Sequence, residues 1–171
     1  WDSTYVPHGI NTDLFYPIPP LHEEYEEVME MKKQIFSIQN TDDIEFVLFY
    51  NNRNIRRKMT SDALLAFQEF RNRLPKEKQD KVAFLLHTQP MDENGTDLRR
   101  LVRHLMPECN IVFSQDKLTS KKLNQMYNVA DVTINIASNE GFGLGTAESL
   151  VAGTPVIVNV TGGLQDQCGF A

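Results

Sequence analysis

The stretch VTINIASNEGFGLGTAESLVAGTPVIV, residues 132–158, decides the fold of this chain. It opens with a short apolar run at 132–136 and passes through a glycine-rich loop into a helical pattern at 144–151. A second apolar run at 155–158 closes it. Two short apolar runs joined by a helix predict a βαβ unit, in which two parallel strands are covered by the helix.

The same alternation extends upstream from this unit. Apolar runs at 44–50, 82–87 and 110–113 predict three more strands. Helical spacing of apolar residues predicts helices at 61–74, 97–106 and 120–129, and Ser61 is the expected N-cap of the first. We therefore predict an α/β, Rossmann-like fold with a parallel sheet and helices on both faces.

The composition is that of a globular protein with a real core. The 171 residues are 41% hydrophobic and 23% charged, which excludes a disordered tail, a collagen-like repeat and a coiled coil. The 23 acidic against 17 basic side chains argue against broad nucleic-acid binding. The two cysteines, Cys109 and Cys168, do not make a disulfide framework, and no apolar run is long enough to cross a membrane.

The chain divides into two parts. Residues 1–40 hold four prolines in the first 20 residues and then a charged, partly helical stretch at 21–40, so they predict a crossover segment. Residues 41–171 carry the alternating pattern and form the predicted domain. The chain starts at Trp1 and stops just after a strand-and-turn pattern, so we expect it to be a piece of a longer protein.

The glycine loop at 138–145 is the densest chemical signal. Open α/β sheets bind ligands at the carboxyl ends of their strands, and this loop follows the fourth strand. Glycines leave backbone amides free to approach a ligand, and a helix N-terminus attracts anions. Glu140 and Glu148 bracket the loop and are suited to accept vicinal hydroxyls. The segment predicts amides for a diphosphate and carboxylates for sugar hydroxyls.

Three other interpretations compete for this loop. A dinucleotide fingerprint fails, because the third glycine comes one residue early and the motif does not open the fold. A glycosidase pair needs two carboxylates facing each other across a sugar, which a loop and a helix residue do not predict. A tight strand–helix turn with two surface glutamates, without any binding role, stays open.

A basic loop follows the first strand. Residues 51–58 (NNRNIRRK) hold four cations, which can clamp phosphates through bidentate Arg and point-charge Lys contacts. A solvated basic loop is the competing interpretation. The predicted sheet places this loop on the same edge as the glycine loop, which favours phosphate binding.

In this order, the motifs resemble those of the retaining GT-B glycosyltransferases of family 4, the group 1 type. The resemblance runs along nearly the whole chain and implies its C-terminal, donor-binding domain. It rests on seven segments: Val6–Asn11 with Phe15–Pro17, Arg53 with Lys58, Ala66–Phe67, Tyr127 with Ala130–Val132, Glu140–Leu144 with Glu148, Ala152–Ile157, and Thr161–Gly163.

The resemblance implies roles for individual residues. Arg53 and Lys58 would neutralise the leaving nucleoside diphosphate, and Glu140 would contact the sugar hydroxyls. These three are the predicted catalytic residues. The predicted donor-binding residues are Glu140, Gly141, Phe142, Gly143, Leu144 and Glu148, with the amides of 142–144 holding sugar and diphosphate and Glu148 binding the ribose.

The chain departs from the family pattern around the basic loop. The family has glycine before the Arg and after the Lys, where this chain has Asn52 and Met59. Arg56 or Arg57 could therefore share the role. His87 replaces a more usual glycine at the end of the second strand, and it is either a structural histidine or faces the cleft.

The resemblance implies transfer of a hexose from a UDP- or GDP-sugar to an unknown acceptor, with retention. It implies neither a cofactor nor a metal, and we expect no nucleic-acid partner, no membrane span and a cytoplasmic location. The acceptor domain and the end of the donor domain are expected outside the chain, so these residues alone should be inactive. A non-catalytic nucleotide-sugar binding module, and a GT-B epimerase or phosphorylase, remain alternatives.

Overall fold

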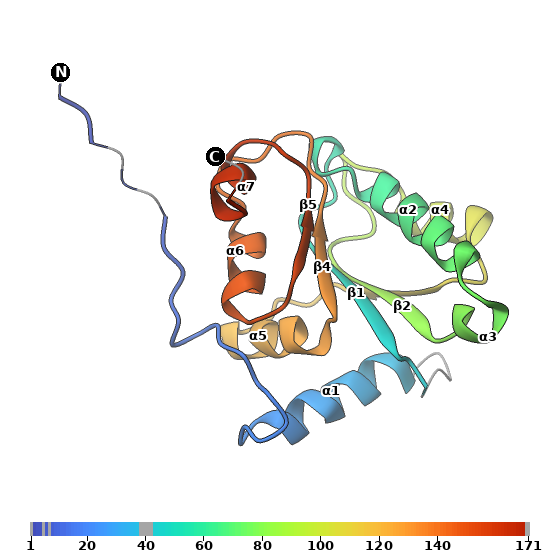
Figure 1. The fold of residues 1–171 in the computed structure, drawn as a ribbon. Coiled ribbons are helices and arrows are strands. Elements are labelled where there is room, and N and C mark those ends of the chain that lie inside the picture. Colours follow the sequence, from blue (N-terminus) through green and yellow to red (C-terminus); the bar gives the residue numbers. More distant parts are fainter. Residues whose placement is uncertain (1, 5, 7, 38–42, 170–171) are drawn as a thin grey trace.

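A five-stranded parallel sheet forms the centre of the molecule, with the strand order β3-β2-β1-β4-β5 (Figure 1). The computed structural model describes residues 2–4, 6, 8–37 and 43–169. Pro7 of the crossover motif and residues 38–40 of the charged stretch lie outside the described residues. The strands are β1 (Phe46–Asn51), β2 (Val82–His87), β3 (Asn110–Ser114), β4 (Val132–Asn135) and β5 (Val156–Val158).

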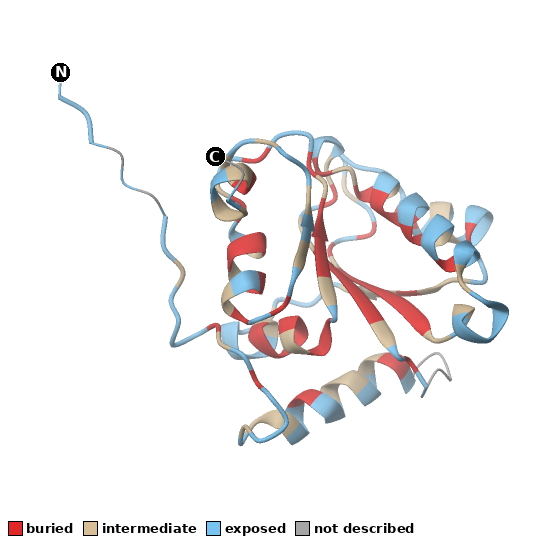
Figure 2. Ribbon diagram, viewed as in Figure 1, coloured by how far each residue is buried: buried red, intermediate tan, exposed pale blue. Residues whose placement is uncertain are grey.

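Helices cover both faces of this sheet because successive side chains of each strand point to opposite sides. In β1, Val47 and Phe49 enter one core and Leu48 and Tyr50 enter the other. The first core lies against α1 (Tyr25–Ser37), α5 (Ser120–Val129) and α6 (Leu144–Val151), and the second against α2 (Thr60–Arg73) and α4 (Leu98–Leu105). Burial is therefore continuous along the central strands, as Figure 2 shows. The predicted α/β fold is confirmed.

The predicted strands and long helices are found with ends shifted by two residues at most. Three short elements were not predicted: the 3-10 turn η1 (Arg56–Lys58), α3 (Lys76–Gln79) and α7 (Gly163–Gln167). None is long enough to show a hydrophobic period. The predicted N-cap Ser61 is wrong. The N-cap is Met59, in a left-handed conformation, and the Ser61 hydroxyl instead donates to Thr96 Oγ1.

The strand order brings two distant loops together. The chain runs from β1 to β2 and β3 on one side, then returns to place β4 on the other side of β1. The loops that follow β1 and β4 therefore leave the same edge of the sheet as neighbours. Such a switch point is where open α/β sheets bind their ligands.

One part of the sheet is less well covered. On the α2 side, an apolar groove of about 360 Å³ lies over β1, β4 and β5, and its lining includes Phe70, Ile134 and Ile157. Ile157 is 51% exposed there. The helix layer on this face thus stops short of β5, which is an edge strand within the described part of the chain.

Candidate functional site

The glycine loop (residues 138–145) leaves β4 and enters α6 at Gly143. Gly143 adopts φ +85°, a left-handed conformation that other residues rarely take, and it is the N-cap of α6. Within the described residues, the amides of Phe142, Gly143 and Leu144 donate no hydrogen bond. These amides lie at the positive end of a helix and are available to an anion.

Gly162 and Gly163, the N-cap and first residue of α7, pack directly against the backbone of the glycine loop. Gly162, at φ +48°, and Gly163 lie so close to the loop that a Cβ on either would overlap the carbonyl oxygen of Glu140 or Gly141. The Gly163 amide donates to both of these carbonyls. Gln167 of α7 donates from its Nε2 to the Phe142 carbonyl. The predicted Gly-Gly turn is thus a support that fixes the path of the glycine loop.

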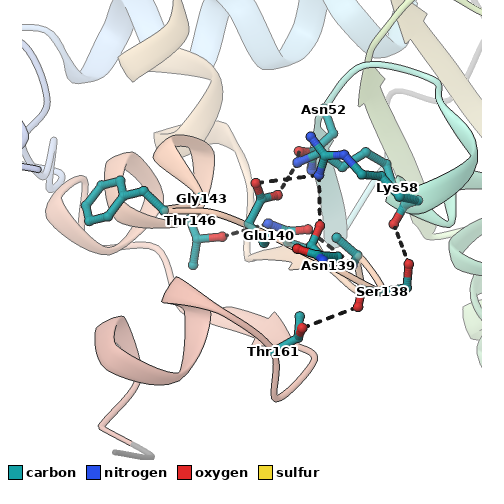
Figure 3. Close-up of polar contacts among 12 residues, drawn as sticks. Asn52, Lys58, Ser138, Asn139, Glu140, Gly143, Thr146 and Thr161 are labelled. Atoms are coloured by element: carbon teal, nitrogen blue, oxygen red, sulfur yellow. Dashed lines mark hydrogen bonds and ion pairs between the residues drawn. The ribbon is translucent and has the colours of Figure 1, made fainter.

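A buried ion pair joins the two loops. Lys58 Nζ donates to Glu140 Oε2 and, at 2.6 Å, to Asn52 Oδ1 (Figure 3). The side chains of Lys58 and Glu140 are each only 9% exposed. Arg57 approaches the other carboxylate oxygen of Glu140 at 3.7 Å and donates to the Asn139 carbonyl at 2.8 Å. Arg57, left open by the sequence, therefore lies against the glycine loop.

The backbone around Lys58 is fixed by contacts on both sides. Tyr50 is fully buried, and its hydroxyl contacts the Lys58 carbonyl at 3.2 Å and Thr60 Oγ1 at 2.7 Å. The next residue, Met59, has φ +54° and is the only described non-glycine residue with positive φ. Met59, at the position where the family motif has glycine, thus adopts a left-handed backbone.

Arg53 occupies a different position from Lys58. Its Nε donates to Asp92 Oδ2 at 2.7 Å and a terminal nitrogen donates to Asp92 Oδ1 at 3.2 Å. This pairing lowers the pKa of Asp92. The Arg53 side chain is 61% exposed, so it remains accessible beside the pair.

Glu148 lies one turn into α6 and is half-buried. Its Oε2 accepts from the Tyr127 hydroxyl at 2.8 Å, and Asn51 Nδ2 donates to the same hydroxyl at 2.8 Å. Burial raises the pKa of Glu148, and the hydrogen bond from Tyr127 opposes this rise.

Two adjoining cavities lie along this edge of the sheet and share Asn51 and Asn52. The first measures about 450 Å³ and is lined by Lys58, Glu140, Phe142, Gly143, Leu144 and Glu148, together with His8, Leu123 and Gly145. The second measures about 340 Å³ and is lined by Arg53, His87, Thr88, Gln89 and residues 114–117. Gly141 belongs to the loop but does not line either cavity.

The other predicted site residues thus divide between the two cavities, with Arg53 in the second and the rest in the first. His87 does face a cavity, and its Nδ1 lies 3.0 Å from Ser114 Oγ. Burial lowers the pKa of His87. Asn51, Asn52 and His8 were not predicted to line the site. Only the two asparagines had a signal in the sequence, because they stand at the carboxyl end of the first predicted strand.

Neither a metal-binding cluster nor a membrane-spanning helix is found among the described residues. Among them, no three His, Cys, Asp or Glu side chains gather in a way that could hold a metal ion. No helix in the described part of the chain combines the length and apolar character needed to cross a membrane.

Comparison with known proteins places this geometry in a family. The sequence model for family 4 glycosyltransferases in conflict systems matches residues 20–167. The chain belongs to this family. A search of curated proteins finds no match to this glycosyltransferase chain.

Solved structures share the fold of this family 4 glycosyltransferase chain. The C-terminal domain of the group 1 glycosyl transferase LpcC from Francisella tularensis is 20% identical, with a TM-score of 0.67 over 91% of this chain and 72% of that one. HepE from Anabaena, solved with UDP and glucose, is 17% identical, with a TM-score of 0.67 over 92% of this chain. Sucrose-phosphate synthase from Thermosynechococcus elongatus is 26% identical, with a TM-score of 0.64 over 94% of this chain.

The chain spans little more than a third of two of these relatives, 38% of HepE and 35% of sucrose-phosphate synthase. The likeness to LpcC and HepE establishes the fold: a C-terminal domain of the GT-B type.

Proposed function

We propose that this chain is the donor-binding part of a retaining glycosyltransferase that transfers a hexose from a UDP- or GDP-sugar to an acceptor. Family membership supports the reaction class. HepE, solved with UDP and glucose and also with UDP-glucose, supports the class of donor. No cofactor or metal is part of the proposal.

The observation that supports this proposal most directly is the set of residues that line the larger cavity. Its wall combines a buried cation, Lys58, two carboxylates, Glu140 and Glu148, and the N-terminus of α6 with its free amides. A diphosphate needs the cation and amides, and sugar hydroxyls need the carboxylates. The adjoining cavity, which Arg53 lines, offers room for the base of the same ligand.

The proposed chemistry follows from where charge develops. When the bond from the anomeric carbon to the diphosphate breaks, negative charge builds on the leaving diphosphate and positive charge on the sugar. Lys58, Arg53 and the amides of Phe142–Leu144 would stabilise the leaving group more in the transition state than in the ground state. In this mechanism no side chain of the chain forms a covalent bond to the sugar.

Thermal unfolding with a panel of ligands tests the proposal. A ligand that binds only the folded state raises the unfolding temperature by mass action. We expect UDP or GDP, and the matching nucleotide sugars, to raise the unfolding temperature of the wild-type chain, and ADP to have a smaller effect. Glu148→Gln should reduce the shift. No shift with any nucleotide would contradict donor binding.

Product analysis tests the finer points. The anomeric configuration of the first-formed product, read by NMR from turnover with a protein that contains the acceptor domain, should match that of the donor. Inversion would contradict retention. Release of free sugar or an epimerised nucleotide, in place of transfer, would favour the alternative activities.

A further inference from the structure

Tyr127 connects three elements next to the larger of the two cavities (the donor cavity), which its partners Glu148 and Asn51 line. It belongs to α5 and is fully buried. Its hydroxyl lies 2.8 Å from Glu148 Oε2 on α6 and 2.8 Å from Asn51 Nδ2 at the end of β1. Phe49 packs edge-on against the ring with centroids 5.2 Å apart, and Phe15 does so at 6.1 Å. The ring is held from both sides, so its hydroxyl has a fixed position.

The direction of the hydrogen bonds is fixed as well. An amide NH₂ group only donates, so Asn51 Nδ2 occupies an acceptor lone pair of the hydroxyl. The single hydroxyl proton is then directed to Glu148 Oε2. Within the described residues Glu148 Oε1 has no hydrogen-bond partner, and Glu148 lines the cavity.

Gly145, the second residue of α6, leaves room for the contacts among Asn51, Tyr127 and Glu148. A Cβ on Gly145 would lie 3.1 Å from the Asn51 carbonyl oxygen and 3.3 Å from the Tyr127 hydroxyl. Both contacts are tighter than ordinary van der Waals packing. A side chain at this position would press on the Tyr127 hydroxyl, which contacts Glu148, and on the backbone of Asn51, whose side chain contacts that hydroxyl.

We infer that Tyr127 is a positioning residue for the donor ribose: with Asn51 it holds the Glu148 carboxylate in one orientation and presents Oε1 to the two ribose hydroxyls. This inference rests on the proposed function, since it assumes that a nucleotide occupies the cavity. Tyr127 itself acts through Glu148.

The electrostatics give Tyr127 a second effect. Burial raises the pKa of Glu148, and the donated hydrogen bond lowers it, so Tyr127 favours the ionised carboxylate. Burial also keeps the pKa of Tyr127 well above its usual value, so the hydroxyl remains a donor at neutral pH. The other charged or titratable groups of this cavity are His8 from the crossover segment, Lys58 from η1 and Glu140 from the glycine loop.

Tyr127→Phe removes only the hydroxyl and leaves the ring packing intact. Calorimetry would compare UDP with 2′,3′-dideoxy-UDP, or the GDP pair if GDP binds the wild-type chain more tightly. We expect Tyr127→Phe to weaken UDP binding about tenfold, the range for losing a hydrogen bond to a charged group. It should leave binding of the dideoxy analogue unchanged, because that ligand has no hydroxyls for Glu148 to accept.

The pH profile is the second readout. Without the Tyr127 hydroxyl the pKa of Glu148 rises further, so the variant should lose UDP affinity at a higher pH than the wild type as the solution is acidified. The dideoxy analogue should show the same profile with both proteins, which removes the contribution of the diphosphate's own titration.

Matched variants separate positioning from folding. Ser149→Ala deletes another fully buried hydroxyl, one residue along α6, which contacts Thr133 Oγ1 and the Thr154 carbonyl. It should change the unfolding temperature without a difference between the two ligands. If Tyr127 acts through Glu148, Tyr127→Phe in a Glu148→Gln background should cause little further loss.

Each result has a definite meaning. Equal loss of affinity for UDP and its dideoxy analogue, or full additivity with Glu148→Gln, would overturn the positioning role while leaving nucleotide binding intact. Absence of nucleotide binding by the wild-type chain would instead overturn the proposed function.

Discussion

Lys58 and Glu140, separated by 82 residues in the sequence, form a buried ion pair. Lys58 comes from η1 after β1, and Glu140 from the loop after β4. They are the two residues expected to contact adjacent parts of the donor, the diphosphate and the sugar bonded to it. In the structure these two charged groups satisfy each other.

This pairing predicts that Glu140→Gln changes two affinities in opposite directions. A diphosphate that reaches Lys58 must displace the Glu140 carboxylate, so removing the charge should strengthen UDP binding several-fold. UDP-glucose should gain less or lose affinity, because glutamine keeps one acceptor and lacks the charge assistance for sugar hydroxyls. Calorimetry with both ligands measures the ratio. Asp166→Asn, an exposed carboxylate of α7, is the control for net charge. Parallel weakening of both ligands would show that Glu140 does not compete with the diphosphate.

The same pair makes Lys58→Met destabilising. The Glu140 carboxylate would stay buried with only Arg57, at 3.7 Å, to balance it. Removing one partner of a buried pair lowers the free energy of unfolding by about 3 kcal/mol. Denaturant unfolding measures this, and Glu140→Gln added to Lys58→Met should recover part of the loss. Arg53→Met breaks a pair in which the Arg53 side chain is 61% exposed, so it should change stability less than Lys58→Met. If Lys58→Met and Arg53→Met lower the free energy of unfolding equally, the buried pair contributes no more to stability than the more exposed one.

Substitution of Arg53 and of Arg56 tests which arginine of the basic loop contacts the diphosphate. Arg53→Ala should weaken UDP binding about tenfold if its exposed guanidinium contacts the diphosphate. Arg56, which is exposed at the start of η1 and lines neither cavity of the site, should tolerate alanine. Titrations of both variants with UDP decide the matter. A loss with Arg56→Ala and none with Arg53→Ala would show that the phosphate contact lies three residues further along.

Gly162→Ala should lower the stability of the chain and displace the glycine loop. Its φ of +48° is unfavourable for alanine, and the new Cβ would overlap the Glu140 carbonyl oxygen. Backbone strain of this kind costs about 1–3 kcal/mol, and displacement of the glycine loop should weaken nucleotide binding as well. Unfolding and UDP titration check the two effects. Gly141→Ala, where a Cβ meets open space, is the matched control and should remain folded with near-normal stability. Unchanged behaviour of Gly162→Ala would mean that the turn adapts.

The 171 residues alone should bind a nucleotide sugar without transferring the sugar. Transfer requires an acceptor held in line with the anomeric carbon, and such positioning accounts for several kcal/mol of barrier. The described residues offer a donor cavity, and the chain spans only 38% of HepE. Release of UDP from UDP-glucose, measured with candidate acceptors, should stay at the rate of the buffer control. Turnover at about 1 s⁻¹ or faster would contradict the two-domain interpretation.

The sheet could be predicted because its central strands, β1 and β2, are buried on both faces. Val82–His87 is apolar at nearly every position, and such runs between helical patterns are typical of parallel sheets. The neighbouring position of the basic and glycine loops followed from that topology. The paired glutamates, Glu140 and Glu148 with seven residues between them, also appear directly in the sequence.

Other features depend on contacts that no local pattern contains. Met59 has a left-handed backbone, although the residue that usually indicates this conformation in a sequence is glycine. It lies between η1 and α2. The pairing of Arg53 with Asp92, 39 residues away, and of Tyr127 with Glu148 requires the packed tertiary structure. Tyr127 did stand in a recognised motif, but its partner could not be read from spacing.

The placement of β1 between β2 and β4 also governs how the molecule assembles. β1 pairs with β2 through Phe46 and Val82, and with β4 through Leu48 and Val132. The second contact closes a much longer loop of chain, which makes it entropically slower to form. The donor cavity lies between the loops that follow β1 and β4, so it spans this later-forming contact. Any nucleotide held there would bridge the early and late halves of the sheet, and occupancy would slow their separation when the chain unfolds.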